Sequence, residues 1–359
     1  MSHLSKLQSA MKEKSTEAIL VSSEINQRYL SGFSYTDGYM LVLPDEAYLI
    51  TDFRYIEAAR TVVNQEECQV VLPDTRMFAY IQKLLQNHGI KVLTFEESEA
   101  SYALYTRLCE SFEGVTILSG ASAILDALRL YKDEDEIAAM TRAQAVTDAA
   151  FAHILDFITP DRTEIEVALE LEFFMRAHGS EGTAFETIAV SGTNSSRPHG
   201  TPRDVKLEKG FFTMDFGARV DGYCSDMTRT VVIGKADEEM KRLYNTVLLA
   251  QTSAIDALQA GMKCFDADKV ARDIIENAGY KGCFGHSLGH GVGLFIHETP
   301  RLSPASAESE LLLPGHVVTV EPGIYIEGKY GCRIEDMVTV LADGTIHDFT
   351  QSPKGLIEL

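Results

Sequence analysis

Two aspartates, Asp215 and Asp226, lie in neighbouring segments that have the alternating pattern of a β-hairpin. Apolar side chains recur at every second position from Phe212 to Phe216, so Asp215 lies on the opposite face. The chain turns at Asp221-Gly222, and because 226 − 215 = 11 is odd, the two aspartates share a face of any hairpin without a bulge. Carboxylates held so close normally need a shared proton or a cation. A solvated hairpin edge with unrelated acids explains this pair alone equally well.

A second pair of acids repeats the arrangement. Glu321 ends the buried-looking strand pattern Val317–Val320, directly before a turn at Pro322-Gly323. Glu335 lies among apolar neighbours on the returning segment, with Arg333 on the same face. A lone buried carboxylate would be protonated or costly, whereas four carboxylates around hard divalent cations are satisfied.

A glycine-rich segment, residues 284–293, lies between the two pairs and contains His286 and His290. Its glycines disfavour a helix and allow the backbone to pass close to a ligand. Four carboxylates and an imidazole suit Mn, Co, Zn or Fe better than an all-oxygen magnesium site. Two such ions about 3.5–4 Å apart can share a hydroxide and bind a tetrahedral intermediate. The residues therefore predict metal-assisted hydrolysis.

The elements that must position these residues form a mixed α/β (α+β) chain of two domains, which we place at 1–125 and 126–359. In the first domain, helical patterns at 4–14 and 76–88 alternate with short strands at 18–21, 40–43, 48–51, 91–94 and 115–118. It has no nucleotide-binding glycine motif.

The second domain is predicted as two helix-plus-hairpin halves in succession. A charged stretch at 132–136 opens a helix that runs to about Ile158, and Thr163 with Glu166 forms a capping box for a helix that runs to Gly179. The remaining pattern predicts strands at 211–216, 223–233, 317–321 and 333–341, with helices near 236–260 and 266–278.

Composition restricts the partners and the compartment. The chain has 32 Lys+Arg and 53 Asp+Glu, so the net charge is 32 − 53 = −21 and a nucleic acid is excluded as a partner. No apolar run approaches the roughly 18 residues of a membrane span, and the first residues lack the apolar core of a signal peptide. The six cysteines are scattered, which fits a reducing compartment. We expect a cytoplasmic protein.

Five motifs together resemble the pita-bread metallopeptidases, specifically the Xaa-Pro dipeptidase (prolidase) and aminopeptidase P branch. The motifs are 214–217 (Met-Asp-Phe-Gly), 225–230 (Ser-Asp-Met-Thr-Arg-Thr), 289–293 (Gly-His-Gly-Val-Gly), 321–325 (Glu-Pro-Gly-Ile-Tyr) and 333–336 (Arg-Ile-Glu-Asp). Residues 29–33 are similar to a segment of the creatinase/prolidase N-terminal domain. The resemblance implies a creatinase-like N-terminal α/β domain followed by a pita-bread domain whose two halves are related by a pseudo-twofold.

The resemblance also implies a ligand set for two divalent metal ions, with Mn(II) expected first and Co(II), Zn(II) or Fe(II) as alternatives. Asp226 and Glu335 would bridge the two ions, Asp215 would hold one, and His290 and Glu321 would hold the other. Glu321 would also contact the bridging hydroxide and shuttle protons.

The resemblance further implies roles for residues around the metals. His199 and His297 match histidines that stabilise the charge on the scissile carbonyl group. His286 and Tyr325 match positions near the proline pocket, although His286 alone is also compatible with a structural, hydrogen-bonded histidine. Arg333 and Thr228 match residues that orient the metal ligands. Arg197 departs from the small or apolar residue expected before Pro198-His199, and we expect it on the surface.

The expected reaction is hydrolysis of the Xaa-Pro bond at the N-terminus of dipeptides or short peptides, in a protein that the resemblance predicts to be a homodimer. The nearest alternative is a methionine aminopeptidase-like exopeptidase, which shares the metal set. Residues 285–289 also spell the G-x-S-x-G motif of serine hydrolases, but the flanking segments are a poor strand and a poor helix. A non-catalytic pita-bread binding module is disfavoured because all five ligand positions are filled.

Overall fold

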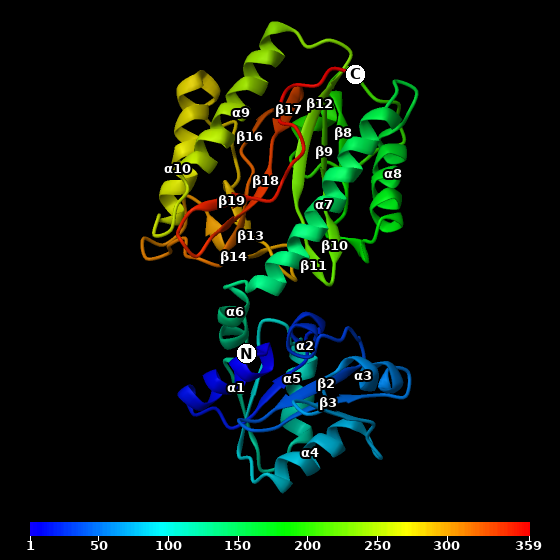
Figure 1. The fold of residues 1–359 in the computed structure, drawn as a ribbon, viewed down its shortest axis with the longest axis vertical. Helices are drawn as coiled ribbons and strands as arrows, with labels where there is room; N and C mark the ends of the chain where they lie inside the picture. Colours follow the sequence, from blue (N-terminus) through cyan, green and yellow to red (C-terminus); the bar gives the residue numbers. More distant parts are fainter. The chain divides into compact units, whose positions relative to one another are not determined.

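The computed structural model describes all 359 residues, and they form two compact units, Met1–Arg129 and Leu130–Leu359 (Figure 1). The combination of helices and sheets in both units confirms the mixed α/β class. None of the helices combines the length and the apolar composition that a membrane span requires. The domain boundaries predicted from the sequence, 1–125 and 126–359, describe domains that fold independently, and these boundaries stay a prediction.

The first unit contains a six-stranded mixed sheet in the order β4-β3-β2-β1-β5-β6. Its strands are β1 (Ile19–Val21), β2 (Gly38–Val42), β3 (Ala47–Thr51), β4 (Gln69–Val71), β5 (Val92–Phe95) and β6 (Thr116–Ser119). Its helices are α1 (His3–Lys14), α2 (Glu24–Ser31), α3 (Ile56–Val62), α4 (Met77–Asn87), α5 (Tyr102–Ser111) and α6 (Ala121–Arg129). Apolar residues of β1, β2, β3 and β5 pack with those of α4 and α5 into one core.

The first half of the second unit begins with two helices, α7 (Glu134–Phe157) and α8 (Glu164–Ala177). The predicted capping box is present: the Thr163 side chain accepts from the backbone N–H of Glu166, and the Glu166 side chain accepts from that of Thr163. The strands that follow are β7 (Gly182–Thr183), β8 (Ile188–Ser191), β9 (Gly210–Phe216), β10 (Ala218–Val220), β11 (Tyr223–Cys224) and β12 (Met227–Ile233), with a short 3-10 helix at Gly192–Ser196 before β9. The apolar faces of α7 and α8 pack on β9 and β12.

The second half repeats this order with α9 (Glu238–Ala257) and α10 (Cys264–Ile275). Its strands are β13 (Gly289–Gly291), β14 (Glu298–Leu302), β15 (Val317–Val320), β16 (Gly323–Ile326), β17 (Tyr330–Arg333), β18 (Asp336–Val340) and β19 (Ile346–Asp348). The helices α9 and α10 pack with β15, β16, β17 and β18 into a second core. Figure 1 shows each helix pair beside its own strands, as the two predicted halves require.

Each hairpin is interrupted where its acids lie, and here the sequence expectation of continuous strands at 223–233 and 333–341 is wrong. In the first hairpin the pairs Phe216–Met227 and Arg219–Cys224 keep one register on both sides of the interruption. At the interruption a Cβ on Gly217 would lie 2.0 Å from the carbonyl oxygen of Ser225. Only glycine therefore allows the two backbone segments of the hairpin to come so close. The second hairpin behaves likewise, with Val320–Asp336 and Gly323–Arg333 in one register.

Two glycines of the segment 284–293 are required by close packing of the backbone. A Cβ on Gly289 would lie 1.9 Å from the carbonyl oxygen of Thr319, and one on Gly291 would lie 2.2 Å from that of Thr299. Close packing of β13 between β14 and β15 requires these glycines. Gly289 also lines the cavity described below, so the approach of the backbone to a ligand stays a prediction.

Candidate active site

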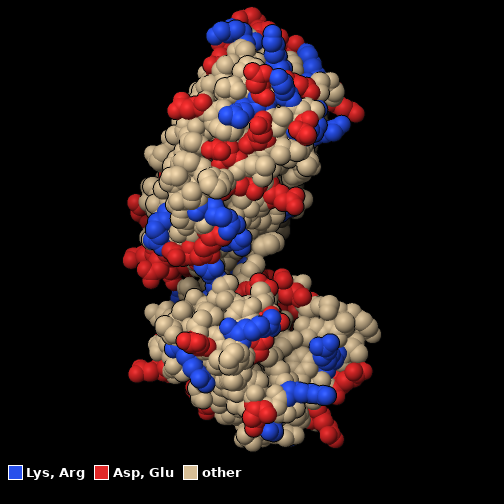
Figure 2. Space-filling model, turned by 90° about the vertical axis from the view of Figure 1, so that its right-hand side faces the viewer, with Lys and Arg blue, Asp and Glu red and all other residues tan.

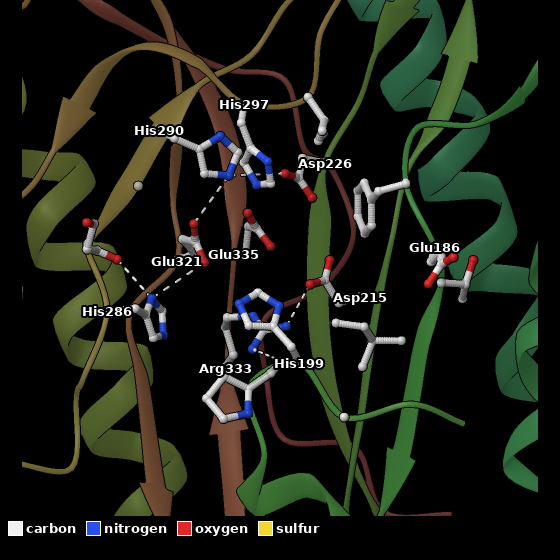
Figure 3. Close-up of a pocket in the computed structure, with 18 of the residues that line it drawn as sticks. Glu186, His199, Asp215, Asp226, His286, His290, His297, Glu321, Arg333 and Glu335 are labelled. Atoms are coloured by element: carbon white, nitrogen blue, oxygen red, sulfur yellow. Dashed lines mark hydrogen bonds and ion pairs between the residues drawn. The ribbon is translucent and has the colours of Figure 1, made fainter. Parts of the chain in front are cut away.

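A cavity of about 530 Å³ lies within the second unit. Its wall includes all five predicted metal ligands and four other predicted site residues, namely Asp215, Asp226, His290, Glu321, Glu335, His199, His286, His297 and Arg333 (Figure 3). Tyr325 and Thr228 are not part of the wall.

The interruptions of the two hairpins present the acids to the cavity. Asp226 and Glu335 lie directly before β12 and β18, at equivalent places in the two halves. Asp215 lies on β9 opposite Thr228, so Asp226 is its diagonal neighbour, one of the two placements that the odd spacing permits. Glu321 directly follows β15, and His290 is the central residue of β13.

Asp226, His290 and Glu335 are buried and bring one ligand atom each to within 4.8 Å of one another. His290 Nε2 lies 3.6 Å from Asp226 Oδ2 and 3.4 Å from Glu321 Oε1. His290 Nδ1 lies 3.0 Å from the carbonyl oxygen of Gly291, to which it donates its proton. Burial lowers the pKa of His290 to about 4, so the imidazole is neutral and the lone pair on Nε2 faces the carboxylates.

Three of the four carboxylates, those of Asp226, Glu321 and Glu335, are buried near one another and are costly to ionise without a cation. Burial, followed by repulsion from neighbouring carboxylates, raises the pKa values of Asp226 and Glu335 well above their usual range. Burial also raises the pKa of Glu321 to about 8, partly offset by Arg333. In addition, Asp215 Oδ1 is buried and has no hydrogen-bond partner. These four carboxylates and the lone pair of His290 are a donor set that fits divalent metal ions.

Arg333 links the ligands of the two halves. Its Nη2 donates to Asp215 Oδ2 at 2.6 Å and its Nε donates to Thr228 Oγ1 at 2.9 Å. The Thr228 hydroxyl in turn donates to Glu335 Oε2 at 2.6 Å. One buried guanidinium therefore fixes the orientation of Asp215 directly and that of Glu335 through Thr228.

Tyr325 is hydrogen-bonded to two residues of the cavity wall, Arg333 and His286. Arg333 Nη1 donates to Tyr325 Oη at 2.7 Å, and that hydroxyl donates to His286 Nε2 at 3.1 Å. His286 Nδ1 donates to the carbonyl oxygen of Ser287 at 2.9 Å, and burial lowers the pKa of His286 to about 3. The His286 ring is thus a neutral, fixed part of the wall.

His199 and His297 enter the cavity from opposite halves. His297 packs edge-on against His290 with ring centroids 4.5 Å apart, and burial lowers the pKa of His297. The residue after it, Glu298, forms an ion pair of 3.0 Å with Lys132, and both side chains are almost fully buried. His199 follows Pro198, whose carbonyl oxygen accepts from Arg333 Nη1 at 3.3 Å. Arg197 is exposed and does not line the cavity.

Several residues of the site were missed by the sequence analysis. Arg301 on β14 and the segment 185–188 line the cavity, and Arg301 lies opposite His290 in the strand register. Arg229 is fully buried and donates to the carbonyl oxygens of Thr228 at 3.0 Å and Glu335 at 2.6 Å, which satisfies backbone groups at the interruption. A charged residue inside the apolar strand 227–233 is the signal that could have identified Arg229.

Ser287 does not have the geometry of a serine hydrolase. The G-x-S-x-G motif requires a strand before the serine and a helix after it. Residues 281–288 are irregular, and β13 follows the serine instead of a helix. The structure therefore does not favour the serine-hydrolase alternative.

Comparison with known families agrees with this geometry. Residues 138–342 match the metallopeptidase family M24, and residues 3–131 match the creatinase/prolidase N-terminal domain. The chain belongs to metallopeptidase family M24, and the resemblance and the fold expected from the sequence are confirmed. The family implies divalent metal ions, which the donor set of the cavity fits.

Individual relatives match over almost the whole chain. The chain is 36% identical to an Xaa-Pro dipeptidase of Pyrococcus furiosus, with 95% of each chain covered. A solved Xaa-Pro dipeptidase from Bacillus anthracis is 40% identical with a TM-score of 0.93, and 99% of each chain is covered. A solved X-Pro aminopeptidase from Thermotoga maritima is 35% identical with a TM-score of 0.89, and 96% of this chain and 97% of that chain are covered. These relatives do not favour the methionine aminopeptidase alternative.

Proposed function

We propose that the protein is a metal-dependent exopeptidase that hydrolyses the Xaa-Pro bond at the N-terminus of dipeptides or short peptides. The observation that carries the proposal is the convergence of four carboxylates and one neutral imidazole on one cavity. The relatives named as Xaa-Pro dipeptidases and X-Pro aminopeptidases support the substrate class.

Each ligand has a proposed place in the metal site. Asp226 and Glu335, at equivalent points of the two halves, would each contact both ions, Asp215 would hold one ion, and His290 with Glu321 would hold the other. Divalent ions at such a site lower the pKa of water and polarise a carbonyl group. Arg333 and Thr228 keep Asp215 and Glu335 oriented for this binding.

The remaining residues would transfer a proton and stabilise the negative charge that develops on the scissile carbonyl oxygen. Glu321 is the proposed proton shuttle, because its carboxyl group lines the cavity beside His290 and the other ligand carboxylates. His199 and His297 would donate hydrogen bonds to the scissile carbonyl oxygen as negative charge develops there.

Recognition of proline would depend on the shape of the cavity wall instead of on a hydrogen bond to a peptide N–H. An Xaa-Pro bond has no N–H, so a peptidase cannot use a hydrogen bond to that group and needs a shaped wall for the ring. We place the proline ring against His286, which Tyr325 holds in position.

The finer assignments belong to the same proposal. We propose two divalent ions per chain, with Mn(II) as the first candidate, a homodimer in solution, and action in the cytoplasm. Elemental analysis of the purified protein measures the number and identity of the ions, and sedimentation measures the assembly.

Arg301 favours a free carboxylate at the end of the substrate. Its guanidinium lines the cavity and makes no ion pair, so it can accept the terminal carboxylate of a dipeptide. We therefore place dipeptides before longer peptides in the order of preference. The Arg301→Gln variant should raise KM for Ala-Pro more than for Ala-Pro-Ala.

The test is hydrolysis of Ala-Pro, Ala-Pro-Ala, Ala-Ala and Met-Ala-Ser by protein that has been supplied with Mn(II) or Co(II). We expect cleavage of Ala-Pro with kcat/KM far above that of Ala-Ala. Equal rates for Ala-Pro and Ala-Ala, or a preference for Met-Ala-Ser, would refute the proposal.

A further inference from the structure

Two charged side chains of the cavity wall remain after the metal site has been assigned. The four ligand carboxylates face the proposed metals, and Arg333 is committed to Asp215, Thr228 and Tyr325. The remaining charges are the cation Arg301 and the anion Glu186. Glu186 is exposed to solvent and makes no ion pair with the protein, so its carboxylate is available to a substrate.

Glu186 lies on the side of the cavity where Asp215 stands. It precedes by two residues Ile188, which begins β8 and pairs with Asp215 on β9. Figure 3 shows Glu186 and His286 on opposite sides of the metal-ligand cluster. Because the proposed function places the proline ring against His286, we place the residue before the cleaved bond on the opposite side of the cluster, toward Glu186.

The wall around Glu186 suits a long side chain with a charged end. Phe185 and Ile188 flank it with partly buried apolar surface, and Ile296 adds a third apolar side chain to the same cavity. Lysine and arginine lay their methylene groups on apolar surface and keep the charged end in a polar environment. An apolar side chain would use the same surface but would gain no ion pair with Glu186.

We propose that Glu186 binds the cationic side chain of the first substrate residue, and that the enzyme therefore prefers Xaa-Pro substrates that begin with lysine or arginine. This inference rests on the proposed Xaa-Pro hydrolysis and adds its specificity for the first residue. The net charge of −21 acts in the same direction, because an anionic protein attracts cationic substrates.

The test compares lysyl-proline with norleucyl-proline, which has a straight side chain of similar length without the ammonium group. We expect kcat/KM for lysyl-proline to exceed that for norleucyl-proline by about two- to fivefold in the native protein, as for an ion pair with a solvent-exposed carboxylate. The Glu186→Gln variant should remove this ratio and leave the rate for norleucyl-proline unchanged. The Glu186→Lys variant should reverse the ratio.

A matched control is Asp204→Asn, which removes an exposed carboxylate that does not line the cavity and changes the net charge equally. It should leave the ratio unchanged. An equal loss for both dipeptides in Glu186→Gln would assign Glu186 to the substrate's α-ammonium group and overturn the inference, as would an unchanged ratio. If metal-loaded native protein cleaved neither dipeptide, the proposed function itself would fail, and the inference with it.

Discussion

The two halves of the second unit share a backbone plan but contribute different chemistry. Each half has two helices and an interrupted hairpin, and each places one acid directly before the last long strand of that hairpin: Asp226 before β12 and Glu335 before β18. The second acids differ, because Asp215 lies within β9 whereas Glu321 lies just beyond β15. The backbone repeat therefore fixes one carboxylate position per half more strictly than the other.

The two halves differ more in the other site residues that they contribute than in their carboxylates. The first half contributes both aspartates and Thr228, while the second contributes His290 and Arg333 as well as its glutamates. Arg333 reaches from the second half to Asp215 and Thr228 of the first. A repeated frame can thus position the ligands symmetrically while one half supplies the groups that orient them.

The largest effect is expected at the two equivalent acids. Asp226→Asn and Glu335→Gln each remove a proposed ligand of both ions, so both variants should lose metal and lose more activity than the roughly 10²-fold typical of a residue that only supports a ligand. Elemental analysis and the rate of Ala-Pro hydrolysis measure the two losses. Asp204→Asn, an exposed acid outside the cavity, is the control.

Unequal losses of metal in these two variants would contradict the equivalence of Asp226 and Glu335. If Asp226→Asn abolished metal binding while Glu335→Gln retained both ions, the two positions would be equivalent in the backbone only. Full activity of exhaustively chelated native protein would contradict the metal site altogether.

The second effect is expected at the two histidines that enter from opposite halves. Removing one hydrogen-bond donor to a developing oxyanion typically costs about 10²–10³ in kcat. His199→Ala and His297→Ala should each lose this much, retain the metal and change KM little. A variant with normal melting, full metal content and unchanged kcat would exclude that histidine from the reaction and show which half stabilises the carbonyl charge.

The smallest effect is a dependence of stability on pH in metal-free protein. Burial raises the pKa of Glu321 from 4.5 to about 8, and raises those of Asp226 and Glu335, so the folded state holds more protons than the unfolded state between these values. Because stability falls with pH wherever the folded state binds more protons, the melting temperature of metal-free protein should fall by several degrees from about pH 5 to pH 8.

Metal-loaded protein should not show this fall, since bound cations keep the carboxylates ionised at both pH values. Calorimetry of chelated and loaded protein in the same buffers makes the comparison. A melting temperature of metal-free protein that rises over this range would contradict the burial of three uncompensated carboxylates.

The sequence predicted the hairpins and the five converging residues because both depend on local patterns. Period-two alternation marks a strand whatever surrounds it, and an acid within an apolar strand is conspicuous. The same rule failed at the interruptions, since alternation continues across Gly217 and Ser225 although the backbone pairing stops there. A close contact between two backbone segments leaves no periodic pattern in the sequence.

Residues that depend on distant contacts were not predicted. Arg301 and Glu186 lie in the cavity only because β14 and β8 pair with β13 and β9, and neither strand alternates clearly in sequence. In the first unit, α2, α3, α5, α6 and β4 were also missed, because they are short and rely on the surrounding structure for stability. The predicted site roles remain predictions until the variants are measured.

Figure 2 shows the distribution of charged side chains over one face of the protein. Figure 2 shows acidic side chains interspersed with basic ones over the face in view. The exclusion of a nucleic acid as a partner rests on the net charge of −21 and stays a prediction.

Because the proposed ligands come from both halves, bound metal would act as a reversible cross-link of the polypeptide. Ions shared by Asp226 and Glu335, as proposed above, would tie positions 335 − 226 = 109 residues apart, a separation at which loss of chain entropy in the unfolded state is considerable. Ions that bind only the folded state also stabilise it in proportion to the logarithm of their concentration. Metal supply would therefore set the lifetime of this chain against proteases as well as its turnover of peptides.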